Sequence, residues 1–266
     1  MSEIKTVSKE IHLSELFIAS QIYPALGIAS FSIAIWHSLG YETVLPGLII
    51  FHATWLAYLF DSYSFDAADV INKPRRYSLS LKYHAVQEAI MFYCIISLIA
   101  LPFIYHKPEL LLVLIPCALL CLNYSKAIIS KVRFKNLALI KPFIPAIAIS
   151  TAIILLPGIN GEMVFTPLFS CWILLLLFSN IFYCDIEDID GDEITGLKTP
   201  AVYMGEKNAK TIYFCLSIAH IYLGFSNGYL WGCTSLILFV LTLIPSKENL
   251  KTDLFLFVPT LILLVY

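Results

Sequence analysis

Residues 163–192 read MVFTPLFSCWILLLLFSNIFYCDIEDIDGD, a long apolar run that ends in a cluster of acidic residues. A bilayer core about 30 Å thick needs roughly 20 apolar residues of helix to cross it. The stretch therefore predicts a membrane-spanning helix with carboxylates at its end. If the helix continues past Asp185, then Asp185, Asp188 and Asp192 would point within about 60° of one another, at about 100° per residue.

A second acidic cluster ends another apolar stretch about half the chain earlier. Residues 59–76 read LFDSYSFDAADVINKPRR and contain Asp61, Asp66 and Asp69. On a helix, Asp61 and Asp69 would lie about 80° apart, with Asp66 about 60° further round. The two clusters hold a large share of the 19 acidic residues in an otherwise apolar chain.

The composition predicts an all-α membrane protein. Of the 266 residues, 59% are hydrophobic and only 14% charged, and no soluble globular domain of this size has that composition. The net charge of −2 gives no reason to expect nucleic acid as a partner. The polar N-terminus lacks the apolar core of a secretory signal, so we expect it to be retained. We expect one domain, 1–266.

We expect about nine membrane-spanning helices in a single bundle, because nine apolar stretches approach the length needed to cross a bilayer. Several contain proline, which membrane helices tolerate where neighbouring groups satisfy the freed carbonyl. The predicted segments are 14–37, 43–62, 84–105, 108–124, 137–157, 163–185, 208–226, 229–245 and 252–266.

The basic residues predict the orientation of these helices. With nine spans and a cytoplasmic N-terminus, nearly all of the 17 lysines and arginines fall on the cytoplasmic side, as the positive-inside rule requires. Only Lys107 falls on the opposite side, and Lys141 falls inside a predicted span. The same assignment places both acidic clusters at the cytoplasmic face of a multi-pass integral membrane protein.

The acidic clusters indicate a metal-assisted phosphate site. Carboxylates this close raise one another's pKa unless a cation neutralises them. Mg²⁺ prefers oxygen ligands and is commonly shared between one or two carboxylates and a substrate phosphate. The alternative is that the acids are solvated loop residues. The candidate Mg²⁺ ligands are Asp61, Asp66, Asp69, Asp185, Asp188 and Asp192, of which Asp61, Asp69, Asp185 and Asp188 are the candidate catalytic residues.

Basic residues near the clusters are candidate diphosphate contacts. Arg76, Lys126 and Lys198 could stabilise phosphate oxygens and the charge that develops on a leaving group. They could instead serve only to fix topology and meet anionic lipid. Lys141 is a site candidate because charge inside a span is costly, although its side chain could also extend to the interface.

The motifs resemble those of the UbiA superfamily of membrane prenyltransferases, in which NDxxDxxxD follows the second helix and DxxDxxxD the sixth. The second motif is complete, and its usual continuation GDxxxGxxT is present as Gly191, Asp192, Gly196 and Thr199. The first motif is degenerate, because Asp61 stands at the usual Asn and Phe65 at the middle Asp.

Two further stretches carry the resemblance. Asp69 is followed by VINKPRR, similar to the family's xxNxPxRP, which aligns Asn72 and Arg76 as substrate contacts. Tyr124 and Ser125 precede a basic loop, as in the family's segment after the fourth helix, and the resemblance makes Tyr124 a further candidate substrate contact.

The resemblance implies a bundle around a central cavity and an Mg²⁺-dependent enzyme. Such an enzyme ionises an isoprenyl diphosphate and transfers the prenyl group to an aromatic or other lipophilic acceptor, with the prenyl tail reaching into membrane lipid. A terpene cyclase acting on the same diphosphates, or a non-catalytic lipid-binding or transport protein, are the alternatives. Prenyl chain length, acceptor and oligomeric state do not follow from the sequence.

Overall fold

The computed structural model describes residues 13–41, 43–64, 67–128, 131–137, 140–158 and 165–243. All regular elements in these residues are helices. They are α1 (Leu13–Ala19), α2 (Ile22–Ser38), α3 (Val44–Tyr63), α4 (Ala67–Asn72), α5 (Pro74–Lys82), α6 (His84–Ile104), η1 (Pro108–Leu110), α7 (Leu111–Ser125), η2 (Phe134–Asn136), α8 (Phe143–Gly158), α9 (Pro167–Glu187), α10 (Ile189–Ile194), α11 (Pro200–Met204), α12 (Glu206–Asn227) and α13 (Tyr229–Thr242).

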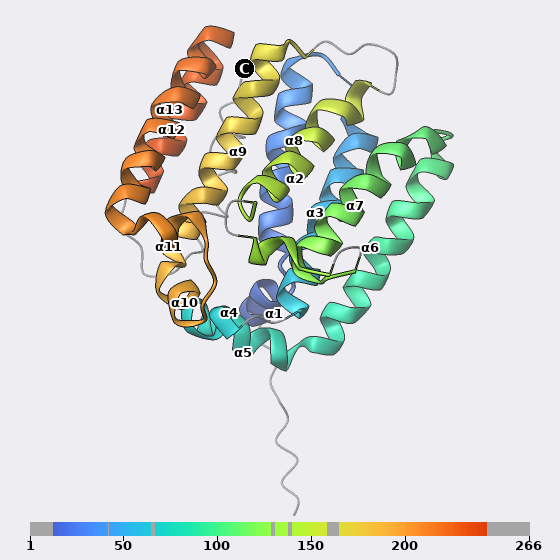
Figure 1. The fold of residues 1–266 in the computed structure, drawn as a ribbon. Coiled ribbons are helices and arrows are strands. Elements are labelled where there is room, and N and C mark those ends of the chain that lie inside the picture. Colours follow the sequence, from blue (N-terminus) through green and yellow to red (C-terminus); the bar gives the residue numbers. More distant parts are fainter. Residues whose placement is uncertain are drawn as a thin grey trace, which may run out of the picture.

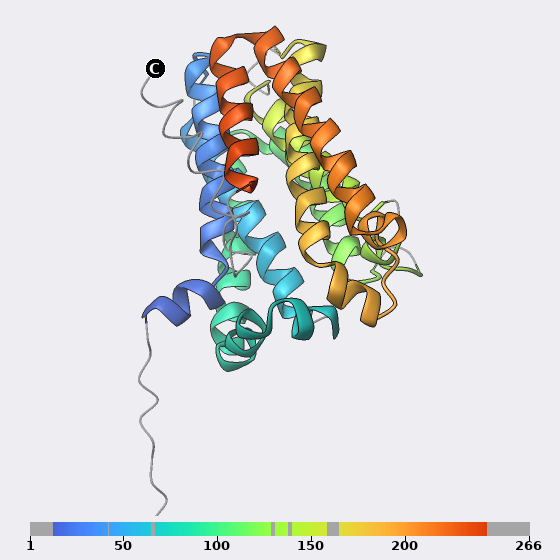
Figure 2. The ribbon, with the colours of Figure 1, turned by 90° about the vertical axis from the view of Figure 1, so that its left-hand side faces the viewer.

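The long helices run side by side in one bundle, and the short helices α1, α4, α5, α10 and α11 gather at one end of it (Figure 1). After a quarter turn, α1, α4, α5, α10 and α11 still lie at that end (Figure 2). The helices that carry the two acidic segments therefore approach the same end of the bundle, although the segments are more than a hundred residues apart in sequence.

Eight of the nine predicted membrane segments coincide with helices or a helix pair, and the ninth, 252–266, lies outside the described residues. Within the described part, four helices are long and apolar enough to cross a membrane, or five if α1 and α2 form one broken span. Two shorter apolar helices are Phe143–Pro157 and Tyr229–Thr242. The predicted all-helical class is confirmed, whereas the count of nine spans is not.

The first predicted segment is broken instead of continuous. α1 and α2 meet at an angle of 66°, and Gln21 at the break adopts a left-handed backbone conformation with φ 53°. Two carbonyl groups freed there accept hydrogen bonds from distant side chains: Ser20 from Trp55 Nε1 at 2.6 Å, and Ala19 from Gln87 Nε2 at 2.7 Å. These contacts satisfy backbone groups that would otherwise be left unpaired.

The predicted start of the fifth segment is wrong by several residues. α8 begins at Phe143, so Lys141 lies in the turn before the helix and not inside a span. Pro142 explains the late start, because a proline disfavours the helical conformation of the residue before it. The turn leaves the Lys141 side chain able to reach the neighbouring α9–α10 junction.

The core at the far end of the bundle is aromatic. Trp172 of α9 packs against Phe169 and Trp231, with ring centroids 5.1 and 5.2 Å apart. α12 and α13 approach closely beside it, since a Cβ on Gly232 would lie 2.2 Å from the Phe225 ring. This packing holds α9, and therefore the acidic segment at its end, in a fixed position.

Candidate functional site

The two acidic segments meet at one end of a cavity of about 910 Å³. The short helix α4, which carries Asp69 of the first cluster, packs against α10, which carries Asp192 of the second. The cavity is lined by five of the predicted aspartates, together with four basic residues. They are Asp61, Asp69, Asp185, Asp188, Asp192, Lys73, Arg76, Lys135 and Lys141.

The second acidic segment is buried and paired with lysines. Asp185, Asp188 and Asp192 are 3%, 9% and 2% exposed. Lys141 Nζ lies 3.0 Å from Asp185 Oδ1 and 2.8 Å from Asp192 Oδ2. Lys73 Nζ, from the other acidic segment, lies 2.8 Å from Asp188 Oδ2. The predicted convergence of these three carboxylates is observed, and lysines provide the positive charge between them.

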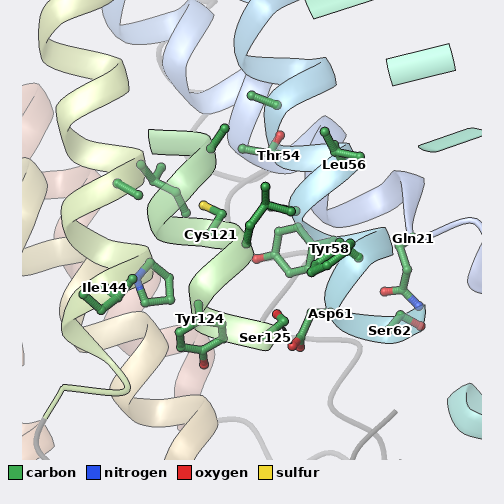
Figure 3. Close-up of a pocket in the computed structure, with 18 of the residues that line it drawn as sticks. Gln21, Thr54, Leu56, Tyr58, Asp61, Ser62, Cys121, Tyr124, Ser125 and Ile144 are labelled. Atoms are coloured by element: carbon green, nitrogen blue, oxygen red, sulfur yellow. Dashed lines mark hydrogen bonds between the residues drawn. The ribbon is translucent and has the colours of Figure 1, made fainter. Parts of the chain in front are cut away.

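The first acidic segment is arranged differently. Asp61, near the end of α3, accepts hydrogen bonds on Oδ1 from Ser125 Oγ at 2.7 Å and from Lys135 Nζ at 3.1 Å. Figure 3 shows Asp61 and Ser125 facing each other at the polar end of the cavity. Among the described residues, the Asp69 carboxylate makes no hydrogen bond or ion pair. Asp66 lies outside the described residues.

The surroundings shift the pKa values of the groups at this end. Burial raises the pKa of the Asp69 carboxyl, and the Asp61 carboxylate raises it further. Burial also raises the pKa of Asp192, although Lys141 opposes that effect. Burial lowers the pKa of Lys73, but Asp188 and Asp69 raise it, and the net direction is upward. Lys73 is therefore held charged. The lysines near Asp69 do not offset the burial and the Asp61 charge that raise the pKa of its carboxyl.

Three of the other predicted contact residues line the cavity, and two do not. Arg76 and Tyr124 line the cavity, and the Arg76 guanidinium donates a hydrogen bond to the Tyr23 hydroxyl. Figure 3 shows the Tyr124 hydroxyl pointing away from Cys121, toward the polar end. Asn72 also lines the cavity, but its carboxamide bonds to the backbone of Asp188 and Gly191.

Lys126 and Lys198 do not line the cavity in the described structure. Both are exposed. Their roles as diphosphate contacts remain predictions from sequence.

Two cavity lysines were not singled out by the sequence analysis. Lys73 has a local signal, because it directly follows Asn72 in the stretch that resembles the family. Lys135 has none, because it reaches Asp61 only through the fold of the loop between α7 and α8. Its side chain is 7% exposed, which is unusual for a lysine unless it is paired.

The rest of the cavity is apolar and extends along α3, α6, α7 and α8. Ile49 and Ala53 of α3 and Ala148 of α8 line it, and α6 contributes Phe92 and Ile95. Figure 3 shows Thr54 and Leu56 lining the cavity well away from the charged end marked by Asp61. The cavity thus joins a charged head region to a long apolar tail region.

The donor set at the charged end fits a magnesium ion shared with a phosphate. Within the described residues no three His, Cys, Asp or Glu side chains form a closed metal-ligand group. Asp185 Oδ2, however, is buried without a hydrogen-bond partner, and the Asp69 carboxylate makes no hydrogen bond or ion pair among the described residues. Mg²⁺ characteristically takes only one or two protein carboxylates and completes its shell with water and phosphate. These two carboxylates are suited to that mode.

Solved structures with the same fold come from two archaea. A UbiA homologue from Archaeoglobus fulgidus bound to DMAPP and Mg²⁺ superposes with a TM-score of 0.64 at 16% identity, covering 94% of this chain and 99% of that one. The same homologue bound to GPP and Mg²⁺ gives 0.66 at 16%, covering 94% and 96%. The apo structure of a UbiA homologue from Aeropyrum pernix K1 gives 0.61 at 15%, covering 92% and 97%.

No curated protein sequence matches this chain significantly. The sequence model described as the UbiA prenyltransferase family matches residues 25–252, which is most of the chain. That range includes both acidic segments and every helix from α3 to α13. The chain therefore belongs to the UbiA prenyltransferase family.

Proposed function

We propose that this protein is an intramembrane prenyltransferase that ionises an isoprenyl diphosphate with Mg²⁺ and transfers the prenyl group to an aromatic or other lipophilic acceptor. The main support is one cavity that has aspartates and lysines at one end and apolar side chains along the rest. An isoprenyl diphosphate has the same division into a charged head and an apolar tail. The A. fulgidus homologue was solved with two such ligands, DMAPP and GPP.

Asp69 and Asp185 would hold the metal, because each has a carboxylate oxygen without a hydrogen bond among the described residues. Asp61, Asp66, Asp188 and Asp192 are further candidate ligands. When bound, Mg²⁺ would neutralise the charge that builds on the departing diphosphate. Asp188 and Asp192 would then keep Lys73 and Lys141 charged and directed at the same region.

The lysines would supply the remaining positive charge. Lys73, Lys135 and Lys141 each hold an ion pair with a cavity carboxylate. A diphosphate entering between the two acidic segments would offer these ammonium groups phosphate oxygens in addition to their carboxylates. Preorganised cations placed where negative charge develops stabilise a transition state without reorganisation.

The apolar walls would protect the allylic cation that forms when the carbon–oxygen bond breaks. Water must be excluded for that cation to react with the acceptor, and side chains such as Ile49, Ala53 and Ala148 exclude it. Phe92 and Ile95 line the cavity and are also 67% and 45% exposed on α6. A long prenyl tail could leave the cavity on that side and extend into lipid.

The orientation in the membrane is part of the proposal. The acidic segments and the basic residues beside them, Lys73 and Arg76 among others, lie at the end of the bundle where the short helices gather. The positive-inside rule assigns such an end to the cytoplasm. Water-soluble diphosphate substrates would then enter from the cytoplasm.

The test uses purified protein in nanodiscs with geranyl, farnesyl and geranylgeranyl diphosphate, with and without Mg²⁺ and a panel of aromatic acceptors. Diphosphate release that requires both metal and acceptor, with a prenylated product, supports the transferase. A cyclic hydrocarbon or alcohol formed without acceptor identifies a cyclase instead. If no diphosphate is consumed and none raises the unfolding temperature, the protein is not an enzyme of this class.

A further inference from the structure

Asn72 joins the two acidic segments through their backbones. It is the last residue of α4, one helical turn after Asp69. Its Oδ1 accepts a hydrogen bond from the Gly191 N–H at 2.9 Å, and its Nδ2 donates one to the Asp188 carbonyl at 3.0 Å. The two partners are separated from Asn72 by 119 and 116 residues.

The Gly191 N–H needs such an acceptor because of its position in α10. It is the third residue of that helix, and the first N–H groups of a helix have no acceptor within it. No side chain of α10's own N-cap supplies one. Asn72 Oδ1 therefore takes the place of a capping group, although it comes from another helix.

The orientation of the carboxamide is fixed by its two partners. An N–H requires an oxygen opposite it, and a carbonyl requires the amide nitrogen, so only one of the two flipped orientations satisfies both. The Asp188 carbonyl also accepts the helical bond from Asp192 N–H at 3.1 Å. Both ends of the Asn72 amide are thus committed to the backbone of the second acidic segment.

The Asn72 side chain occupies the space beside Gly191 and leaves no room there for a side chain. A Cβ at this position would lie 2.4 Å from Asn72 Oδ1 and 2.5 Å from its Cγ. A Cβ that close would force either the Asn72 carboxamide or the two helices to move, and either displacement would break the paired hydrogen bonds. The contact depends on the side chain of one residue and on the absence of a side chain at the other.

We propose that Asn72 and Gly191 form a clasp that sets the distance between Asp69 and the pair Asp188 and Asp192. Asn72 is then a positioning residue that acts through the aspartates and does not need to touch the substrate. The clasp rests on hydrogen bonds and packing, whereas its effect on metal-dependent chemistry rests on the proposed function. A shared metal and diphosphate would require this distance to be held closely.

The clasp itself is tested without any activity, by hydrogen exchange of full-length protein in detergent. Asn72→Ala is expected to increase the exchange rate of the Gly191 amide at least tenfold, because that N–H loses its acceptor, Asn72 Oδ1. Asn227→Ala is the matched control, since its Nδ2 bonds to the Leu223 carbonyl at the end of α12. An unchanged Gly191 amide in Asn72→Ala would overturn the clasp.

The steric half of the clasp is tested by a double-mutant cycle on the unfolding temperature. Gly191→Ala is expected to lower it, and Asn72→Ala/Gly191→Ala to recover most of the loss, because the second change removes the colliding amide. Gly232→Ala provides the control, since its Cβ would meet Phe225 far from the site and Asn72→Ala should not rescue it. If the fall in unfolding temperature of Asn72→Ala/Gly191→Ala equals the sum of the falls in the two single variants, the steric contact is overturned.

The positioning role is tested by the Mg²⁺ concentration that gives half-maximal diphosphate release. Asn72→Ala is expected to raise that concentration at least tenfold. Gly232→Ala should lower the unfolding temperature but leave the half-maximal Mg²⁺ concentration unchanged. An unchanged metal requirement, with only the KM for the isoprenyl diphosphate raised, would mean that Asn72 contacts substrate. If the unmodified protein releases no diphosphate, the proposed function fails, and the exchange and unfolding cycles still decide whether the clasp exists.

Discussion

The first and second acidic segments reach the same end of the cavity with different structures. The second has carboxylates at helical spacing on the consecutive helices α9 and α10, and Asp185, Asp188 and Asp192 all converge and are buried. The first is distributed over two helices, with Asp61 near the end of α3 and Asp69 on the separate helix α4. In the second segment, helical spacing itself brings the three carboxylates together. In the first segment, Asp61 and Asp69 stand on different helices, and the fold of other elements must bring them to the same place.

The largest expected effect tests whether the carboxylates of the second segment take part in diphosphate release. Asp185→Ala and Asp188→Ala should each reduce diphosphate release at least about a hundredfold, comparable to removing a preorganised electrostatic group. The measurement is diphosphate release by folded protein, with folding checked by gel filtration in detergent.

Asp190→Ala is the matched control for these variants, because Asp190 belongs to the same segment but is exposed. It should retain activity close to that of the unmodified protein. Full activity in both Asp185→Ala and Asp188→Ala would show that these carboxylates do not take part in diphosphate release.

The lysine partners should differ between the two segments in their effect on stability. Lys141→Met leaves Asp185 and Asp192, both nearly inaccessible, without their cation, and removing one partner of a buried pair costs about 3–5 kcal/mol. Lys135→Met should cost less, because the Asp61 side chain is 42% exposed and keeps its Ser125 bond. Chemical unfolding of both variants measures the difference.

Lys198→Met is the control for this pair, since Lys198 is exposed and outside the cavity lining. Equal losses of stability in Lys141→Met and Lys135→Met would mean that the two segments are equally dependent on their lysines.

The helix segments were largely predictable from sequence, because apolar length and charge distribution follow from the membrane itself. The break at Ser20 was not, since Trp55 and Gln87 stabilise it from distant helices. The aspartates of the site were predictable from their spacing. The partners of Asn72 and Lys135 were not, because long-range folding alone brings them together.

Within the first segment, Asp69→Ala should be more harmful than Asp66→Ala. The Asp69 carboxylate makes no hydrogen bond or ion pair among the described residues and is positioned by α4 beside the second segment, so it is available to a metal. Asp66 is one residue out of register with the family motif and lies outside the described residues. The Mg²⁺ dependence of diphosphate release measures both, and equal or reversed losses would show that the register of the first motif is misassigned.

The smallest effect is expected for Asp61→Asn, which introduces the residue usual in the family. Ser125 and Lys135 both donate to the same atom, Asp61 Oδ1, and an asparagine carbonyl oxygen can accept both bonds. The change should therefore cost less than about fivefold in kcat/KM, close to the value of one ordinary hydrogen bond of about 1 kcal/mol. Asp61→Ala removes the acceptor altogether and should cost clearly more. If Asp61→Asn is instead as damaging as Asp69→Ala, then the negative charge of Asp61 is needed as a metal ligand, and the first segment contributes two ligands to the site and not one.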